Sequence, residues 1–152
     1  MYLKEYLKQF EEKKVKLFID MDGVIVDYVV GSTSEFDKRR PLMSSISKLK
    51  EISEQNNIEL YILSVTRMDE GIEQKETWLD KYADFFDKDK RFIISRQSNE
   101  FKSSSKLKSE FFEELTRDGS VIILIDDDPV VLKEIMNTSS DVVLLKDTAL
   151  VD

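Results

Sequence analysis

Short apolar runs alternate with longer amphipathic stretches along most of the chain. The apolar runs have the length of strands, and most are continuous rather than alternating, which is typical of parallel strands covered on both faces. We predict strands over residues 15–20, 58–63, 91–94, 121–125 and 142–145. Strands that alternate with helix-length segments indicate an α/β fold built on a parallel sheet of about five strands.

The amphipathic stretches predict helices over residues 2–13, 41–55, 71–81, 104–117 and 129–136. Pro41 and Pro129 suit a first helical position, and Asp128 suits the N-cap before Pro129. The sequence shows no internal repeat, long linker or low-complexity segment, so we expect residues 1–152 to form one domain. A chain of this length can bury roughly 68–70% of the surface that its unfolded form exposes.

Composition removes several kinds of chemistry, because the chain contains neither histidine nor cysteine. Nucleophilic catalysis by Ser-His or Cys-His pairs, thiol redox chemistry, and zinc or iron sites built on imidazole or thiolate are therefore excluded for this chain alone. Carboxylate, hydroxyl and lysine chemistry remain. The absence of disulfides is also compatible with a reducing cytoplasm.

The negative net charge of the chain limits the kinds of partner that it can bind. With 31 acidic and 23 basic residues, the formal charge of −8 argues against broad nonspecific binding to nucleic acid. Short basic clusters at residues 38–40 and 88–91 still allow a local basic groove. Charges interrupt the N-terminal segment, and no apolar run approaches the roughly 20 residues of a membrane span. We expect a soluble cytoplasmic protein with no membrane partner.

The first predicted strand ends in two carboxylates one residue apart, Asp20 and Asp22, followed by Gly23. Alternate side chains of a strand share a face, so we expect both carboxylates to point the same way, with Gly23 allowing a sharp turn. Two like charges this close need a cation between them. Mg²⁺ is the simplest candidate, because it prefers carboxylate oxygens and keeps positions open for a substrate phosphate.

Polar side chains also follow the other strands, and in a parallel sheet these positions meet at one edge, where ligands bind. They are Ser64, Thr66, Arg67, Ser95, Arg96, Asp126, Asp127 and Asp128. We expect Asp126 to act in the site, Asp127 to support a metal or lysine, and Asp128 to cap the helix that follows.

Four segments in this order resemble the motifs of haloacid dehalogenase-like (HAD) phosphatases: residues 20–24 (Asp-Met-Asp-Gly-Val), residues 61–64 (Tyr-Ile-Leu-Ser), a lysine opening the next helix, and residues 124–127 (Leu-Ile-Asp-Asp). The resemblance implies a Rossmann-like three-layer sandwich, Mg²⁺ and an aspartyl-phosphate intermediate. Residues 20–28 and 78–82 are more narrowly similar to the 5′(3′)-deoxyribonucleotidase branch.

The resemblance also implies a role for each matched residue. Asp20 attacks phosphorus, and Asp22 protonates the leaving oxygen and then activates water. Ser64 binds the phosphoryl group together with the backbone at Val65, while Asp20, Asp22 and Asp126 form the metal site. Arg67 is a further candidate contact to substrate, as is the lysine of the third motif.

Three lysines lie near the start of the fourth predicted helix, namely Lys102, Lys106 and Lys108. Helical spacing favours Lys108, because the residues three, four and seven positions further on are Phe111, Phe112 and Leu115, which places Lys108 on the apolar face. Lys106 projects almost oppositely. Lys102 becomes the alternative if the helix begins earlier.

Little chain separates Asp22 from Ser64, and one predicted helix uses much of it, so a full helical cap does not fit. A minimal cap leaves the site open. The substrate is then a nucleotide or other phosphorylated metabolite, or a larger molecule recognised by a polynucleotide 3′-phosphatase or a phosphoprotein phosphatase, with Arg67, Arg96 and residues 38–40 as distal contacts. The alternative from another class is a noncatalytic module that binds a phosphorylated partner.

Overall fold

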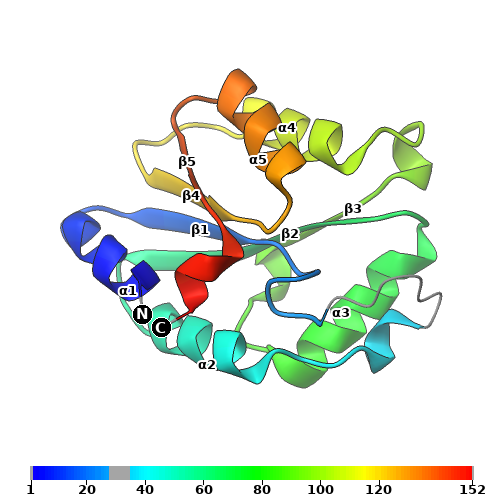
Figure 1. The fold of residues 1–152 in the computed structure, drawn as a ribbon, viewed down its shortest axis with the longest axis horizontal. Helices are drawn as coiled ribbons and strands as arrows, with labels where there is room; N and C mark the ends of the chain where they lie inside the picture. Colours follow the sequence, from blue (N-terminus) through cyan, green and yellow to red (C-terminus); the bar gives the residue numbers. More distant parts are fainter. Residues whose placement is uncertain (1, 28–34, 152) are drawn as a thin grey trace.

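A computed structural model of the chain describes residues 2–27 and 35–151. Its centre is a parallel five-stranded sheet in the order β3-β2-β1-β4-β5 (Figure 1). The strands are β1 (Val15–Ile19), β2 (Ile58–Thr66), β3 (Arg91–Ser95), β4 (Val121–Ile125) and β5 (Val142–Leu145). The first strand in the chain therefore lies in the middle of the sheet.

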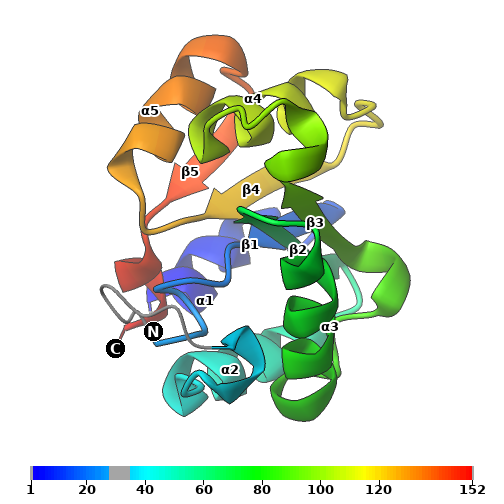
Figure 2. The same ribbon diagram turned by 90° about the vertical axis from the view of Figure 1, so that its right-hand side faces the viewer.

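Helices cover both faces of the sheet, which makes a three-layer, Rossmann-like α/β fold. Two of them, α4 (Ser104–Glu114) and α5 (Pro129–Thr138), lie on one face. The opposite face carries α1 (Tyr2–Leu7), α2 (Met43–Ser53) and α3 (Glu70–Tyr82), as two views at right angles show (Figures 1 and 2). Five short 3-10 turns complete the description: η1 (Lys8–Phe10), η2 (Phe36–Lys38), η3 (Lys88–Lys90), η4 (Gln97–Asn99) and η5 (Asp147–Leu150).

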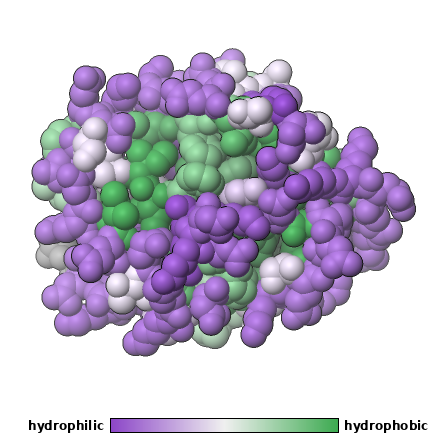
Figure 3. Space-filling view, turned by 180° about the vertical axis from the view of Figure 1, so that it is seen from behind, coloured by the Kyte–Doolittle hydropathy of each residue, from purple (hydrophilic) through white to green (hydrophobic). Residues whose placement is uncertain are grey.

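Each face of the sheet has its own apolar core, because side chains alternate along the central strand. Leu17 and Ile19 of β1 face the α1–α2–α3 layer, where Trp78 is fully buried. Phe18, between them, faces the α4–α5 layer and packs edge-on against Phe112. On the side of the molecule seen from behind, hydrophilic side chains surround the hydrophobic ones that remain visible (Figure 3).

The five predicted strands and five predicted helices are present. The N-terminal helix is shorter than expected, since α1 ends at Leu7 and η1 continues to Phe10, while β2 runs on to Thr66. Among the described residues, no helix is both long enough and apolar enough to cross a membrane.

The placement of Pro41 in the first turn of a helix is wrong. Pro41 bridges Val26 in antiparallel fashion, and the backbone nitrogen of Leu42 donates to the carbonyl oxygen of Ile25. Residues 40–42 are therefore held extended beside residues 25–27, and α2 begins only at Met43.

Candidate active site

The buried centre of the site is an ion triad at the carboxyl end of β1 and β4. The Nζ atom of Lys108 lies 2.9 Å from Oδ1 of Asp20 and 2.6 Å from Oδ2 of Asp126. Asp20 and Asp126 follow directly on Ile19 and Ile125, which are paired in the sheet, so the register brings the two carboxylates to the same level. Lys108 reaches them from α4, as its helical spacing predicted.

Burial and neighbouring charges shift the pKa values of Asp20 and Lys108. Burial raises the pKa of Asp20 to about 7, and the positive charge of Lys108 only partly offsets the increase. Burial by itself would lower the pKa of Lys108, but the charges of Asp20 and Asp126 outweigh it and raise this pKa above its ordinary value. The lysine is therefore held as a cation beside the two carboxylates.

Asp127 adds a third carboxylate to the centre. Asp20, Asp126 and Asp127 each offer an oxygen within 4.8 Å of the other two, an arrangement that could hold a metal ion. Asp127 approaches closely because Gly23 has no side chain: a Cβ atom there would overlap the Asp127 carboxylate, and Gly23 has a φ of +78°. Burial and the neighbouring Asp126 both raise the pKa of Asp127.

Asp22 lies beyond the end of β1, so the strand geometry on which a shared direction with Asp20 was expected does not extend to it. Strand β1 ends at Ile19, and the carbonyl oxygen of Met21 accepts from the backbone nitrogens of residues 24, 25 and 26, which turns the chain sharply. The carboxylate of Asp22 instead lies between two cations. Its Oδ1 is 2.8 Å from a guanidinium nitrogen of Arg39, and its Oδ2 is 3.2 Å from Nζ of Lys75. A direct bond from the Asp22 carboxylate to a metal stays a prediction.

Ser64, near the end of β2, is fully buried and contacts Lys75. The Lys75 ammonium donates to Oγ of Ser64 over 2.7 Å and to the carbonyl oxygen of Val65 over 3.0 Å. Burial lowers the pKa of Lys75, and the charges of Asp22 and Asp20 offset this only in part. A second lysine thus stands on the opposite side of the site from Lys108.

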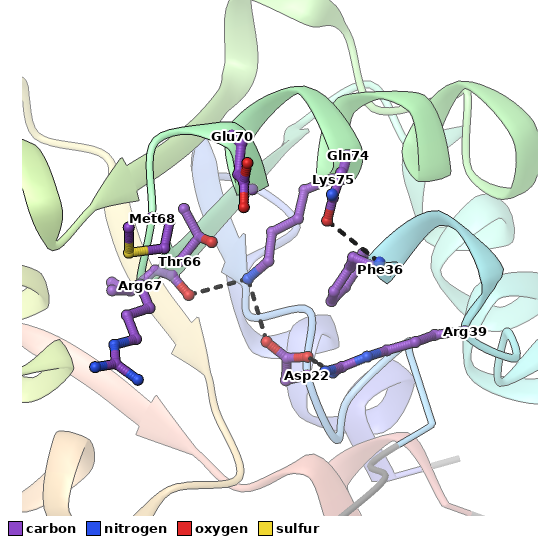
Figure 4. Close-up of a pocket in the computed structure, with 11 residues that line it drawn as sticks. Asp22, Phe36, Arg39, Thr66, Arg67, Met68, Glu70, Gln74 and Lys75 are labelled. Carbon is purple, nitrogen blue, oxygen red and sulfur yellow. Dashed lines mark hydrogen bonds and ion pairs between the residues drawn. The ribbon is translucent and has the colours of Figure 1, made fainter. Parts of the chain in front are cut away.

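A pocket with a cavity volume of about 410 Å³ adjoins these groups (Figure 4). Asp22, Lys75 and Val65 lie at its inner end, whereas Arg67 and Met68 are exposed at its rim. Eleven residues line it: Asp22, Phe36, Arg39, Val65, Thr66, Arg67, Met68, Glu70, Gly71, Gln74 and Lys75. The pocket therefore opens beside Asp22 and Lys75, and Asp20, Ser64 and Lys108 are not among its lining residues.

The wall of the pocket that carries Arg39 is fixed to α3. The backbone nitrogen of Phe36 donates to the side chain of Gln74, and the indole nitrogen of Trp78 donates to the carbonyl oxygen of Arg39. Among the described residues between β1 and α2, η2 is the one helical segment. This agrees with the predicted minimal cap, and residue 28, part of the nucleotidase similarity, lies outside the described residues.

Among the described residues, the side chains of the alternative lysines and of the other basic candidates, Arg96, Lys38 and Arg40, form no hydrogen bond or ion pair with the site residues. Lys102 pairs with Glu110, and Lys106 is exposed on α4. The guanidinium of Arg96 donates to the carbonyl oxygens of Phe101 and Lys102 and so closes its own loop. Exposed ion pairs hold Lys38 to Glu35 and Arg40 to Asp27.

Asp128 caps α5, as predicted. Its carboxylate accepts from the backbone nitrogen of Val130 over 2.9 Å, and its own backbone nitrogen donates to Oδ1 of Asp126. Of the three consecutive aspartates, only Asp126 and Asp127 turn their carboxylates toward the site. Asp128 serves the helix and, through its backbone, the position of Asp126.

Two charged groups of the site differ from expectation: Lys75 was given no role from the sequence, and Arg39, expected among the distal substrate contacts at residues 38–40, bonds Asp22 instead. Lys75 could have been found by helical spacing, since Gly71, Lys75, Trp78 and Leu79 form the buried face of α3. A lysine between a buried glycine and a buried tryptophan signals a functional or paired cation. Arg39 carried no comparable signal, because it belongs to a cluster of three basic residues whose neighbours are both exposed.

Comparison with solved structures supports the α/β fold. A chain in the structure of the Pnkp1/Rnl/Hen1 RNA repair complex aligns with a TM-score of 0.67 and 21% identity, covering 89% of this chain and 42% of that one. A chain from a second structure of a Pnkp1/Rnl/Hen1 complex aligns with a TM-score of 0.66 and 20% identity, covering 88% and 46%. This chain spans less than half of either, and the likeness shows a shared fold.

No protein-family model and no curated protein sequence matches the chain.

Proposed function

We propose that the protein is a Mg²⁺-dependent phosphomonoester hydrolase of the HAD-like kind that forms a phosphorylated intermediate on Asp20. The observation that carries the proposal is the position of Lys108, whose ammonium bonds Asp20 and Asp126 while Asp127 offers a third carboxylate oxygen nearby. A nucleophilic carboxylate, a buried cation and an acidic cluster are the parts that phosphoryl transfer from an ester to a carboxylate requires.

The donor set fits Mg²⁺. Asp20, Asp126 and Asp127 supply hard carboxylate oxygens at mutual distances that a single ion can span. Bound there, Mg²⁺ would supply positive charge against the oxygens of the phosphoryl group.

Asp20 and Asp22 take different roles in the proposed reaction because their side chains differ in exposure. The side chain of Asp20 is 9% exposed, and that of Asp22 is 31% exposed at the inner end of the pocket. In the first step, an oxygen of Asp20 bonds to phosphorus while the ester bond breaks, and Asp22 gives its proton to the leaving oxygen. In the second, Asp22 takes a proton from water as the water oxygen attacks the phosphoryl group, which releases phosphate and restores Asp20.

Ser64 and Lys108 hold the transferred group. Ser64 is buried beside the inner end of the pocket, and Lys108 adjoins the attacking carboxylate, so each can bond a different phosphoryl oxygen. The lysine acts as a point charge that neutralises part of the charge on Asp20 and phosphate together.

The substrate class that we favour is a phosphate-ended polynucleotide. A minimal cap leaves the pocket rim exposed at Arg67 and Met68, so a substrate that extends beyond its phosphate can be accommodated. One of the two structures with which this chain aligns is described as an RNA repair complex. Free nucleotides and phosphoproteins are the competing substrates.

Hydrolysis of an aryl phosphate with Mg²⁺ and with a chelator tests the reaction. We expect turnover that chelation abolishes and that Asp20→Asn removes, whereas Asp128→Asn retains it because asparagine also caps helices. Mass spectrometry of the trapped intermediate should place the phosphate on Asp20. Absence of turnover with Mg²⁺, Mn²⁺ or Co²⁺ would overturn the enzyme and favour a phosphate-binding module.

A substrate panel then tests the substrate class. It compares oligonucleotides with a 3′-phosphate or a 5′-phosphate, nucleoside monophosphates and a phosphopeptide at equal concentrations. We expect the highest kcat/KM with a phosphate-ended oligonucleotide. Base-selective turnover of one mononucleotide would restore the nucleotidase interpretation.

A further inference from the structure

Lys75 is a buried cation that the four HAD-like motifs leave unexplained. It is 3% exposed, and its ammonium contacts Oγ of Ser64, the carbonyl oxygen of Val65 and Oδ2 of Asp22 at 2.7, 3.0 and 3.2 Å. Burying an ammonium is costly unless its hydrogen bonds are satisfied. Here the partners use all three of its N–H donors, so the lysine has a single, fixed geometry.

The contact with Ser64 determines which way the serine hydroxyl can donate. An ammonium only donates, so Oγ of Ser64 must accept from Lys75 and keep its own hydrogen for another group. Within residues 2–27 and 35–151, the Ser64 hydroxyl donates no hydrogen bond. The group that would complete the bond is an oxygen of the substrate phosphate.

The contact between Lys75 and Asp22 restrains the carboxylate of Asp22, the second functional group that Lys75 bonds. Arg39 holds one carboxylate oxygen and Lys75 holds the other, from two different segments of the chain. The carboxylate cannot rotate without breaking one of these bonds. Its position at the pocket is therefore set jointly by Arg39, which directly follows η2, and by Lys75 of α3 (Figure 4).

We infer that Lys75 is a positioning residue that directs the Ser64 hydroxyl toward the phosphoryl group and orients Asp22 toward the leaving oxygen. The inference rests on the proposed hydrolase function and extends it beyond the family motifs. Lys75 thereby links phosphate binding to proton transfer, because one ammonium bonds the groups responsible for each.

The test compares Lys75→Met with Lys81→Met, a change at an exposed lysine of the same helix. Rates are measured on an alkyl phosphate, whose leaving oxygen needs a proton, and on an aryl phosphate with a good leaving group, which needs it less. General acid catalysis contributes about 10²–10⁴-fold, so we expect Lys75→Met to lose at least about tenfold more kcat on the alkyl phosphate than on the aryl phosphate. Lys81→Met should leave both rates and their ratio unchanged.

A double variant tests whether Lys75 acts through Ser64. Because Lys75 acts partly through Ser64, Lys75→Met combined with Ser64→Ala should lose less activity than the product of the two single losses. Thermal unfolding of each variant shows that it is folded at the assay temperature. If Lys75→Met does not fold, Lys75→Gln replaces it, since glutamine is uncharged but still donates a hydrogen bond.

The outcomes separate the inference from the function on which it rests. Equal losses on both phosphates, together with fully multiplicative effects of the two substitutions, would assign Lys75 a purely structural role and overturn the inference while the hydrolase stands. A parent protein that hydrolyses neither phosphate overturns the hydrolase and the inference with it.

Discussion

The indole nitrogen of Trp78 donates a 3.0 Å hydrogen bond to the backbone carbonyl oxygen of Arg39. Trp78 is fully buried, yet the residue that it holds presents its guanidinium to Asp22. The apolar core beneath α3 and the polar site above it are thus joined through one backbone position. A core substitution at Trp78 should therefore affect both stability and the site.

For Trp78→Phe we expect the free energy of unfolding to fall by about 1–3 kcal/mol, because a carbonyl group loses its partner and a cavity opens. Denaturant titration measures the change. Tyr82→Phe, on the same helix, keeps its ring and should change stability by no more than about 0.5 kcal/mol. Equal stabilities for the Trp78 variant and the parent protein would refute the structural role of this hydrogen bond.

Lys108→Met should be strongly destabilising at neutral pH, because it leaves the carboxylates of Asp20 and Asp126 buried without a cation. Breaking a buried ion pair in this way costs about 3–5 kcal/mol. Lys106→Met, two residues away and exposed, should cost no more than about 0.5 kcal/mol. Unfolding curves of both variants measure the difference, and added Mg²⁺ should recover part of the loss in Lys108→Met alone. Similar curves for the two variants would contradict the buried triad.

A comparison of Gly23→Ala with Gly119→Ala separates the cost of backbone strain from the effect of crowding the Asp127 carboxylate. Both glycines have positive φ, so each substitution should cost about 1–2 kcal/mol in backbone strain. Only at Gly23 would the new Cβ atom meet the Asp127 carboxylate, whereas nothing lies within 4 Å at Gly119. Calorimetric titration should show weaker Mg²⁺ binding in Gly23→Ala and unchanged binding in Gly119→Ala. Equal affinities would remove Asp127 from the metal site.

The neighbouring aspartates give a direct test of which carboxylates hold the metal. Asp127→Asn should weaken Mg²⁺ binding at least about tenfold, since even residues that only orient metal ligands are worth 10–100-fold. Asp128→Asn should leave the affinity unchanged, because asparagine can cap α5 equally well. The signal of bound Mn²⁺ in electron paramagnetic resonance provides an independent measurement. Loss of binding in the Asp128 variant would indicate that the ligand set is shifted by one residue.

The hydrophobic pattern was sufficient to predict the order of strands and helices because the strands are short and covered on both faces. The ranges of β4 and β5 were predicted without error, and Lys108 was found because the apolar residues after it define a single helical face. Pro41 failed because its local preference competes with pairing between residues 25–27 and 40–42. That pairing joins segments separated in sequence, and single-residue preferences carry no information about it.

The local geometry of residues 20–22 differs from the strand geometry expected from the sequence. The alternation rule assumed that β1 continues through Asp22, whereas hydrogen bonds to the carbonyl oxygen of Met21 turn the chain first. The two aspartates therefore face different cations. One of those cations, Arg39, reaches Asp22 only because Trp78 and η2 hold its backbone, a tertiary relationship with no local sequence pattern.

The central place of β1 in the sheet gives the segments around Asp20 unequal freedom to change. Asp20 has a hydrogen-bonded neighbouring strand on each side, so its immediate surroundings come from β2 and β4, while β3 and β5 form the margins. The loop after β3 leads into α4, which carries Lys108, whereas the loop after β5 leads into η5. A change after β5 therefore leaves the connection to Lys108 untouched, whereas an insertion after β3 shifts the helix from which Lys108 reaches Asp20 and Asp126.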